Sequence, residues 1–193
     1  MTQIALPVLI AMPVLIAALV VGVVVWVVYN SLVARRNKVR EGLSGIYVQL
    51  QRRADLIPNL VETVKGYARH ERETLETVTR LRTEFLEISR DDADRLGTND
   101  GLLRERISRL VALAEGYPEL KANESFLELQ EQLEETEDQI AASRRIYNAN
   151  VNDYNTRAES FPANLVARRF AFERAVFFTA EAGAERTPVA SLS

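Results

Sequence analysis

A run of about 25 apolar or small residues at positions 4–28 constrains this chain more than any other feature. As a helix the run would be about 37 Å long, which is enough to cross a bilayer core of about 30 Å. The run therefore predicts a transmembrane helix over residues 4–28 that follows a short N-terminal segment, residues 1–3. A cleaved signal peptide fits less well, because no basic residue precedes the run and the run is too long.

The residues that follow the run predict its orientation. Trp26 and Tyr29 carry amphipathic rings that favour the lipid headgroup layer. No charged side chain occurs in residues 1–34, whereas four basic ones follow at once: Arg35, Arg36, Lys38 and Arg40. By the positive-inside rule we expect a single-pass protein of the cell (inner) membrane, with its N-terminus outside and its C-terminal domain in the cytoplasm. The same cluster would attract anionic lipid, so the lipid bilayer is a predicted partner.

Composition excludes several functional classes. The chain has no cysteine, which rules out disulfides, thiol catalysis, cysteine metal sites and a lipidated N-terminal cysteine. Its one histidine, His70, cannot form a paired-histidine metal site, and we expect no cofactor and no metal. The net charge is −3 and residues 35–40 are the longest basic stretch, so nucleic acid is not an expected partner.

Beyond the anchor the pattern predicts an all-α protein, because apolar residues recur at helical spacing and no sustained alternation indicates a strand. We expect the transmembrane helix to continue to about residue 55 and to be interrupted at Ile57-Pro58, since the residue before a proline avoids the helical region. A second helix over 58–90 and a polar loop at 91–99 follow. A shorter third helix ends at 116–118.

The fourth helix has the clearest pattern. It is expected to begin near Asn123 and to end at Phe161-Pro162, and five apolar residues recur in it at seven-residue intervals: Phe126, Leu133, Ile140, Tyr147 and Tyr154. Such narrow stripes must bury one another. The N-terminal transmembrane helix is therefore predicted to continue into an antiparallel, up-down-up-down four-helix bundle over residues 29–160.

A phenylalanine-rich segment over 161–178 would return to the membrane side in this topology. Five phenylalanines lie in it among Arg168, Arg169 and Arg174. Two interpretations remain open. The segment docks on lipid as an interfacial element, or Phe170, Phe172, Phe177 and Phe178 pack on the first and fourth helices as ordinary core. Residues 179–193 are expected to be a flexible tail.

Five stretches together resemble one known family. They are residues 49–68, with Arg52, Arg53, Asp55, Pro58 and Asn59; residues 29–37; residues 117–123, with Tyr117 and Pro118; residues 144–155, with Tyr147, Asn148, Tyr154 and Asn155; and residues 161–164, with Phe161 and Pro162. In this order they resemble the LemA family of bacterial membrane proteins. Some members are single-span proteins of the cell membrane and others are lipoproteins, whose cysteine this chain lacks.

The resemblance implies an anchored antiparallel bundle without enzymatic activity. It favours a membrane scaffold or adaptor that acts through protein–protein or self-association, in membrane organisation or beside membrane proteases. The implied partners are other membrane proteins, a membrane protease among them, and a second copy in a homo-oligomer. The alternative is a carboxylate-based hydrolase or a metal-dependent enzyme. The lone His70 argues against it, because a di-metal bundle needs two Glu-x-x-His motifs and Tyr67 stands where the glutamate should be.

Charged motifs allow structural or functional interpretations. Residues 52–60 are interpreted as the turn between the first two helices, with Asp55 capping the second, or as a binding epitope. Four charged residues lie on or beside the apolar stripes: Arg53, Glu71, Glu137 and Arg144. We expect their stems to lie along the core edge with the charges in water, the alternative being a buried network that sets helix register. The seven acidic residues within 124–138 suggest a solvated face, or a docking site for a basic partner such as a second copy.

Overall fold

The computed structural model describes residues 5–67, 71–114 and 116–179, with side chains from Met12 onward. Every regular element in that part of the chain is a helix, which confirms the all-α prediction. The helices are α1 (Ala5–Tyr67), α2 (Arg72–Glu87), α3 (Ala93–Ala114), α4 (Pro118–Lys121), α5 (Glu124–Glu159) and α6 (Ala163–Arg169). His70, residues 1–4 and residues 180–193 lie outside the described residues.

The described part of the chain divides into two compact units. The anchor unit comprises the described residues within 1–39 and 150–175, and the bundle unit comprises those within 40–149 and 176–193. Helices α1 and α5 each have one end in the anchor unit and the other end in the bundle unit.

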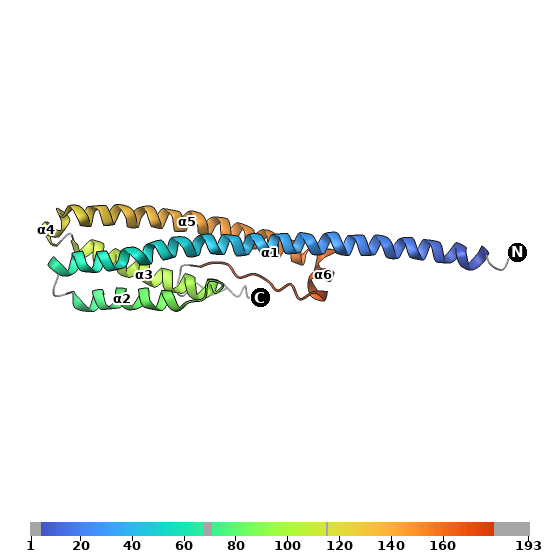
Figure 1. Cartoon of the computed structure of the whole chain (residues 1–193), viewed down its shortest axis with the longest axis horizontal. Helices are drawn as coiled ribbons and strands as arrows, with labels where there is room; N and C mark the ends of the chain where they lie inside the picture. The colour runs from blue at the N-terminus through green and yellow to red at the C-terminus, as the bar shows by residue number, and fades with distance from the viewer. Residues whose placement is uncertain (1–4, 68–70, 115, 180–193) are drawn as a thin grey trace, which may run out of the picture. The chain divides into compact units, whose positions relative to one another are not determined.

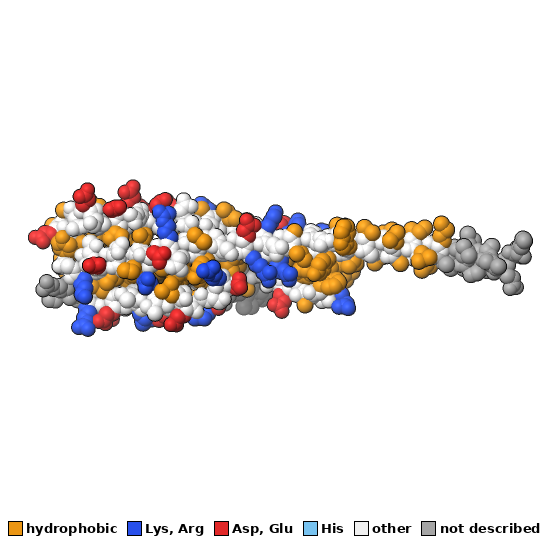
Figure 2. All heavy atoms as spheres, viewed as in Figure 1, with side chains coloured by type: hydrophobic (Ala, Val, Ile, Leu, Met, Phe, Trp, Pro, Cys, Tyr) orange, Lys and Arg blue, Asp and Glu red, His pale blue; other side chains and the backbone are white. Residues whose placement is uncertain are grey.

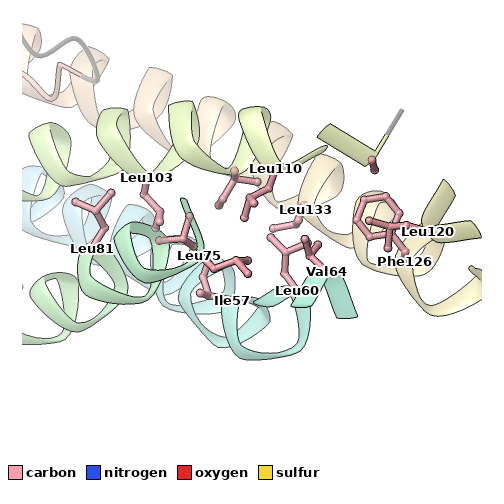
Figure 3. Close-up of a cluster of buried hydrophobic side chains, with 13 residues drawn as sticks. Ile57, Leu60, Val64, Leu75, Leu81, Leu103, Leu110, Leu120, Phe126 and Leu133 are labelled. Carbon is pink, nitrogen blue, oxygen red and sulfur yellow. The ribbon is translucent and has the colours of Figure 1, made fainter. Parts of the chain in front are cut away.

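The bundle unit is an antiparallel four-helix arrangement. The C-terminal half of α1, then α2, α3 and the N-terminal half of α5 alternate in direction (Figure 1). Their buried faces meet in one core, where Leu60 and Val64 of α1 lie near Leu110 of α3 and Leu133 of α5 (Figure 3). The predicted seven-residue stripe of α5 is buried at all five positions, Phe126, Leu133, Ile140, Tyr147 and Tyr154.

The predicted break at Ile57-Pro58 is wrong, because α1 continues through it to Tyr67. A proline inside a helix leaves the carbonyl four residues earlier without its N–H partner. Here that carbonyl belongs to Ala54, and the Arg82 side chain of α2 donates to it from Nε at 2.9 Å. A donor from the neighbouring helix thus replaces the missing hydrogen bond, and the interruption does not occur.

Two further boundaries differ from the prediction. The second helix begins at Arg72 rather than Pro58 and ends at Glu87. The expected loop at 91–99 is shorter, because α3 already begins at Ala93. The Asp92 carboxylate accepts from the Arg95 amide at 3.1 Å and caps the new helix. The start of α5 agrees with expectation, since Asn123 Oδ1 accepts from the Phe126 amide at 3.0 Å.

In the anchor unit, α1 presents its apolar run without protein cover. Between Met12 and Val27 nearly every side chain is exposed, Leu15 by 70% and Leu19 by 69%. This segment is long and apolar enough to cross a membrane. Because a bare apolar helix is costly in water and favourable in lipid, the chain is membrane-anchored through α1.

Candidate functional site: a membrane-flanking collar and a C-terminal strap

The helix α6 packs on α1 at the end of the apolar run. Residues from both helices form a small buried cluster: Val28, Leu32, Ala163, Val166 and Ala167. Val25, Ala158 and Phe172 are half-buried against it. We call residues 25–36 of α1 together with residues 161–172 the collar. It lies at the level of α1 where apolar residues give way to basic ones.

Aromatic and guanidinium groups hold the collar together. The Tyr29 ring meets Phe170 edge-on at 5.1 Å between centroids, and Phe172 at 5.5 Å. The Arg36 guanidinium lies 5.0 Å from the centre of the Phe172 ring, and that of Arg169 lies 5.8 Å from Phe170. Edge-to-face rings and cation–π contacts are each favourable, so the contacts of Tyr29 and Arg36 tie the segment after α6 to α1.

The outer face of the collar is apolar and basic at once. Phe161 is 78% exposed, and Leu165, Phe170 and Trp26 are exposed as well. Figure 2 shows hydrophobic side chains gathered over α6 and the adjoining turns of α1, with basic side chains next to them. Exposed rings beside arginines are typical of elements that lie in the membrane interface.

The phenylalanine-rich segment divides between its two interpretations. Phe178 is buried and Phe172 is half-buried, as the core interpretation requires. Phe161, Phe170 and Phe177 are exposed, so most of the rings do not serve as core.

Residues 172–179 have no regular secondary structure, and we call them the strap (Figure 1). In the anchor unit α5 holds the strap with two neighbouring side chains. Asn155 donates from Nδ2 to the Ala175 carbonyl and accepts the Ala175 amide at Oδ1, both at 2.9 Å. The Tyr154 hydroxyl donates to the Glu173 carbonyl at 2.7 Å. One asparagine thus satisfies both backbone groups of a strap residue.

The same pattern occurs one heptad earlier, in the bundle unit. Asn148 donates to the Phe178 carbonyl at 3.2 Å and accepts the Phe178 amide at 2.9 Å, while Tyr147 donates to the Val176 carbonyl at 2.8 Å. The strap also passes close to α3 there. A β-carbon on Gly97 would lie 2.4 Å from the Thr179 carbonyl oxygen, so only glycine permits this approach.

The heptad spacing of these pairs has a geometric reason. Seven helical residues rise about 10.5 Å, which is about the length of three residues of extended chain. Tyr-Asn pairs seven residues apart on α5 therefore match strap residues three apart. Tyrosine hydroxyls are protonated at neutral pH and can donate, and burial raises the pKa of Tyr147 and Tyr154 further. The motif residues Tyr147, Asn148, Tyr154 and Asn155 thus bind the chain's own C-terminal segment.

Arg53 departs from the expectation of a solvated charge. Its side chain is 3% exposed, and it contacts both Asp100 of α3, also 3% exposed, and Glu137 of α5. Arg104 lies 3.5 Å from the other Glu137 oxygen. Burial raises the pKa of the Asp100 carboxyl, an effect that the Arg53 guanidinium opposes. The expectation that the stem of Arg53 only lines the core edge was wrong, and the buried charge network is the arrangement observed.

The other residues of that motif lie on α1 and do not form a turn. Arg52 is half-exposed and pairs with Glu135 at 2.9 Å. Asp55 is exposed and accepts from Gln51 at 3.0 Å, so it caps no helix, and the turn interpretation is wrong. Pro58 and Asn59 are exposed on α1. Tyr117 and Pro118 begin α4, with Pro118 in its first turn. Pro162 directly precedes α6.

The basic flank is partly engaged within the anchor unit. Arg35 pairs with Asp153 of α5 at 3.0 Å and donates to the Ser31 hydroxyl at 3.1 Å. The Lys38 carbonyl accepts from Asn150 at 3.0 Å, while the Lys38 and Arg40 side chains are exposed. Glu71 and Arg144 are half-buried. Five of the seven acids in 124–138 are exposed and form no ion pair in the described part of the chain: Glu124, Glu128, Glu131, Glu134 and Asp138.

Three residues with decisive roles were not singled out from the sequence. Asp100 shares the buried site of Arg53, Arg82 completes the backbone beside Pro58, and Gly97 admits the strap. Gly97 carried the one available signal, because a glycine inside a helix often marks a close approach. The sequence prediction places it in the polar loop at 91–99 instead. Within the described residues no group of three or more acidic or histidine side chains is placed to hold a metal ion.

Comparisons with known proteins identify a family model and several relatives that match this chain. The family model of the LemA family matches residues 42–191. The chain is 27% identical to Protein LemA of Metamycoplasma hominis over 155 residues, which covers 78% of this chain and 68% of that protein. It is 27% identical over 185 residues to Magnetosome protein MamQ 2 of Paramagnetospirillum magneticum and 25% identical to Magnetosome protein MamQ of Magnetospirillum gryphiswaldense, with 83% and 68% of the two chains covered in each case. None of these names states an enzymatic activity.

Proposed function

The chain belongs to the LemA family, and from that membership we propose that it is a membrane-anchored helical scaffold or adaptor without catalytic activity. It acts at the inner face of the cell membrane by binding other membrane proteins, a membrane protease among them, or a second copy. The basic residues after the apolar run support this orientation.

The observation that carries the proposal is the collar. Its exposed apolar side chains, Phe161, Leu165 and Phe170, flank a span that already anchors the chain. A transmembrane helix alone would suffice for anchoring. A second apolar and basic surface beside the end of the span fits a protein that must keep a defined orientation at the membrane surface, as a scaffold does.

The bundle unit offers a surface for a partner. A groove of about 610 Å³ lies between α3 and α5. Its floor is apolar, with Ile107, Val111 and Phe126, and Leu127 stands at its side with 50% exposure. Charged residues of both signs border the groove: Arg104, Lys121, Glu134 and Glu137. An apolar floor with a mixed charged rim suits an amphipathic helix of another membrane protein.

Site-specific photocrosslinking in native membranes tests the adaptor role. A photoreactive residue at Leu127 should give discrete crosslinked bands containing another membrane protein or a second copy. The matched control is Leu86 on α2, which is 45% exposed and lies outside the groove. No bands from Leu127, or equal bands from both positions, would contradict a partner in this groove.

A further inference from the structure

A small cavity opens in the anchor unit beside the collar. Its volume is about 260 Å³, a little below the range of about 300–1,000 Å³ that small-molecule sites occupy. Ala167 and Phe172 line it and at the same time pack against α1 near Val28 and Leu32. The cavity therefore lies at the level of α1 where the apolar run ends, which is the level of lipid headgroups if α1 spans the bilayer.

Two arginines line this cavity. Arg168, at the end of α6, forms no ion pair within the described residues. Arg174 has only a long contact of 3.7 Å to Glu159, and both of these side chains are mostly exposed. Guanidinium groups bind phosphate oxygens through paired N–H donors, so two of them at one opening favour a phosphate ligand.

Two further polar residues, Asn164 and Glu159, also line the cavity. The Asn164 Oδ1 atom has almost no exposed surface, so a ligand in the cavity would not contact it. The two arginines are therefore the groups that would hold a phosphate.

We propose that this cavity binds the headgroup of an anionic phospholipid, of the phosphatidylglycerol kind. Arg168 and Arg174 bind the phosphate. The acyl chains pass along the exposed collar rings, Phe170 and Phe161, into the bilayer. The inference rests on the proposed function, in which the collar lies at the membrane surface, and it names the lipid that the collar would bind.

Native mass spectrometry of the delipidated full chain in detergent tests the site. With added lipid, the wild type should bind one phosphatidylglycerol at least tenfold more tightly than phosphatidylcholine. The double variant Arg168→Gln, Arg174→Gln should lose that preference. The double variant Arg95→Gln, Arg145→Gln is the matched control, because these two exposed arginines do not line the cavity and their loss removes the same charge. It should bind as the wild type does, and circular dichroism should give the same melting temperature for all variants.

A further arm decides the source of the phosphate. Free glycerol phosphate should compete weakly, and equal affinity for it would reassign the cavity to a soluble phosphate. Equal losses in the two double variants would overturn the cavity and leave only general attraction. Crosslinking from Leu127 does not depend on this cavity, so failure here leaves the adaptor proposal separately testable.

Discussion

At the scale of single residues, Pro58 shows how a helix breaker is accommodated. The carbonyl of Ala54 cannot receive a hydrogen bond from a proline nitrogen, and Arg82 of α2 supplies the donor instead. Because Arg82 is half-buried, the replacement is shielded from water. The continuity of α1 beyond Pro58 thus depends on a residue in another helix.

We expect Arg82→Met to lower the free energy of unfolding by about 1–3 kcal/mol, because it leaves the Ala54 carbonyl without a donor. In a Pro58→Ala background the helix supplies its own N–H, so the cost of Arg82→Met should shrink to below about 1 kcal/mol. Chemical denaturation of the full chain in detergent measures all four proteins of this cycle. An undiminished cost in the Pro58→Ala background would show that Arg82 acts through another contact.

Arg53 is the second residue whose contribution to stability depends on groups from other helices. A buried charge that loses its partner is costly, whereas exposed pairs contribute little. Arg53 and Asp100 are both almost wholly buried, while the adjacent Arg52 forms a half-exposed pair with Glu135. These two neighbouring arginines therefore provide a matched comparison within one turn of α1.

Arg53→Met should destabilise the chain by about 3–5 kcal/mol at neutral pH, and Arg52→Met by no more than about 1 kcal/mol. Burial raises the pKa of the Asp100 carboxyl, so the folded state holds this proton more tightly than the unfolded state does. Stability from this group is therefore present at low pH and is lost as the pH rises through the folded pKa. Without Arg53 to oppose it, the pKa rises further, and the penalty of Arg53→Met should be smaller at about pH 5 than at neutral pH. A penalty that grows on acidification would contradict this assignment.

At the scale of elements, the strap and α5 are matched in length. The Tyr-Asn pairs recur at the period of the helix, and the strap residues they hold recur at the period of an extended chain. Gly97 lets the strap pass against α3, where any larger residue would meet the Thr179 carbonyl. Polar side chains of α5 thus hold the strap by hydrogen bonds, and Gly97 of α3 leaves the space that the strap occupies.

Gly97→Ala should displace the end of the strap, because the new β-carbon would lie 2.4 Å from the Thr179 carbonyl oxygen. Hydrogen–deuterium exchange at the Phe178 amide, which Asn148 protects, should accelerate at least tenfold. Gly45→Ala on α1 is the control, since its β-carbon would meet nothing within 4 Å. It should leave that exchange unchanged and stabilise α1 by up to about 1 kcal/mol. Unaltered protection of Phe178 in Gly97→Ala would mean that the strap is not seated there.

At the scale of the whole molecule, the distribution of charge predicts how the chain is inserted. No charged side chain occurs in residues 1–34, and four basic ones lie within residues 35–40. In single-span proteins this asymmetry places the basic side in the cytoplasm. The helical domain would then lie in the cytoplasm, where soluble and membrane partners can both reach it.

A single cysteine at Asp91, an exposed position between α2 and α3, tests the orientation, because the chain has no other cysteine. In intact cells it should resist a membrane-impermeant thiol reagent, and it should react once the membrane is permeabilised. Ready labelling before permeabilisation would reverse the predicted topology.

The sequence by itself determined the features that depend on near neighbours along the chain. Length and hydropathy specify the apolar run, and the seven-residue recurrence specifies the buried face of α5 from Phe126 to Tyr154. The start of α5 directly after the capping residue Asn123 and its end before Phe161 follow from local capping and proline chemistry. These properties are set by backbone geometry over one or two helical turns, so periodicity is enough to predict them.

Only the tertiary structure decided the features that depend on groups from distant parts of the chain. Whether Pro58 ends a helix depends on Arg82, which lies 28 residues from the carbonyl it serves. The burial of Arg53 depends on carboxylates of α3 and α5. The role of Gly97 appears only when Thr179 lies against it. The physical reason is the same in each case. The free-energy cost of an unpaired carbonyl or a buried charge depends on the group that another element places beside it. The same holds for the space beside a glycine, and the local sequence does not specify which group that will be.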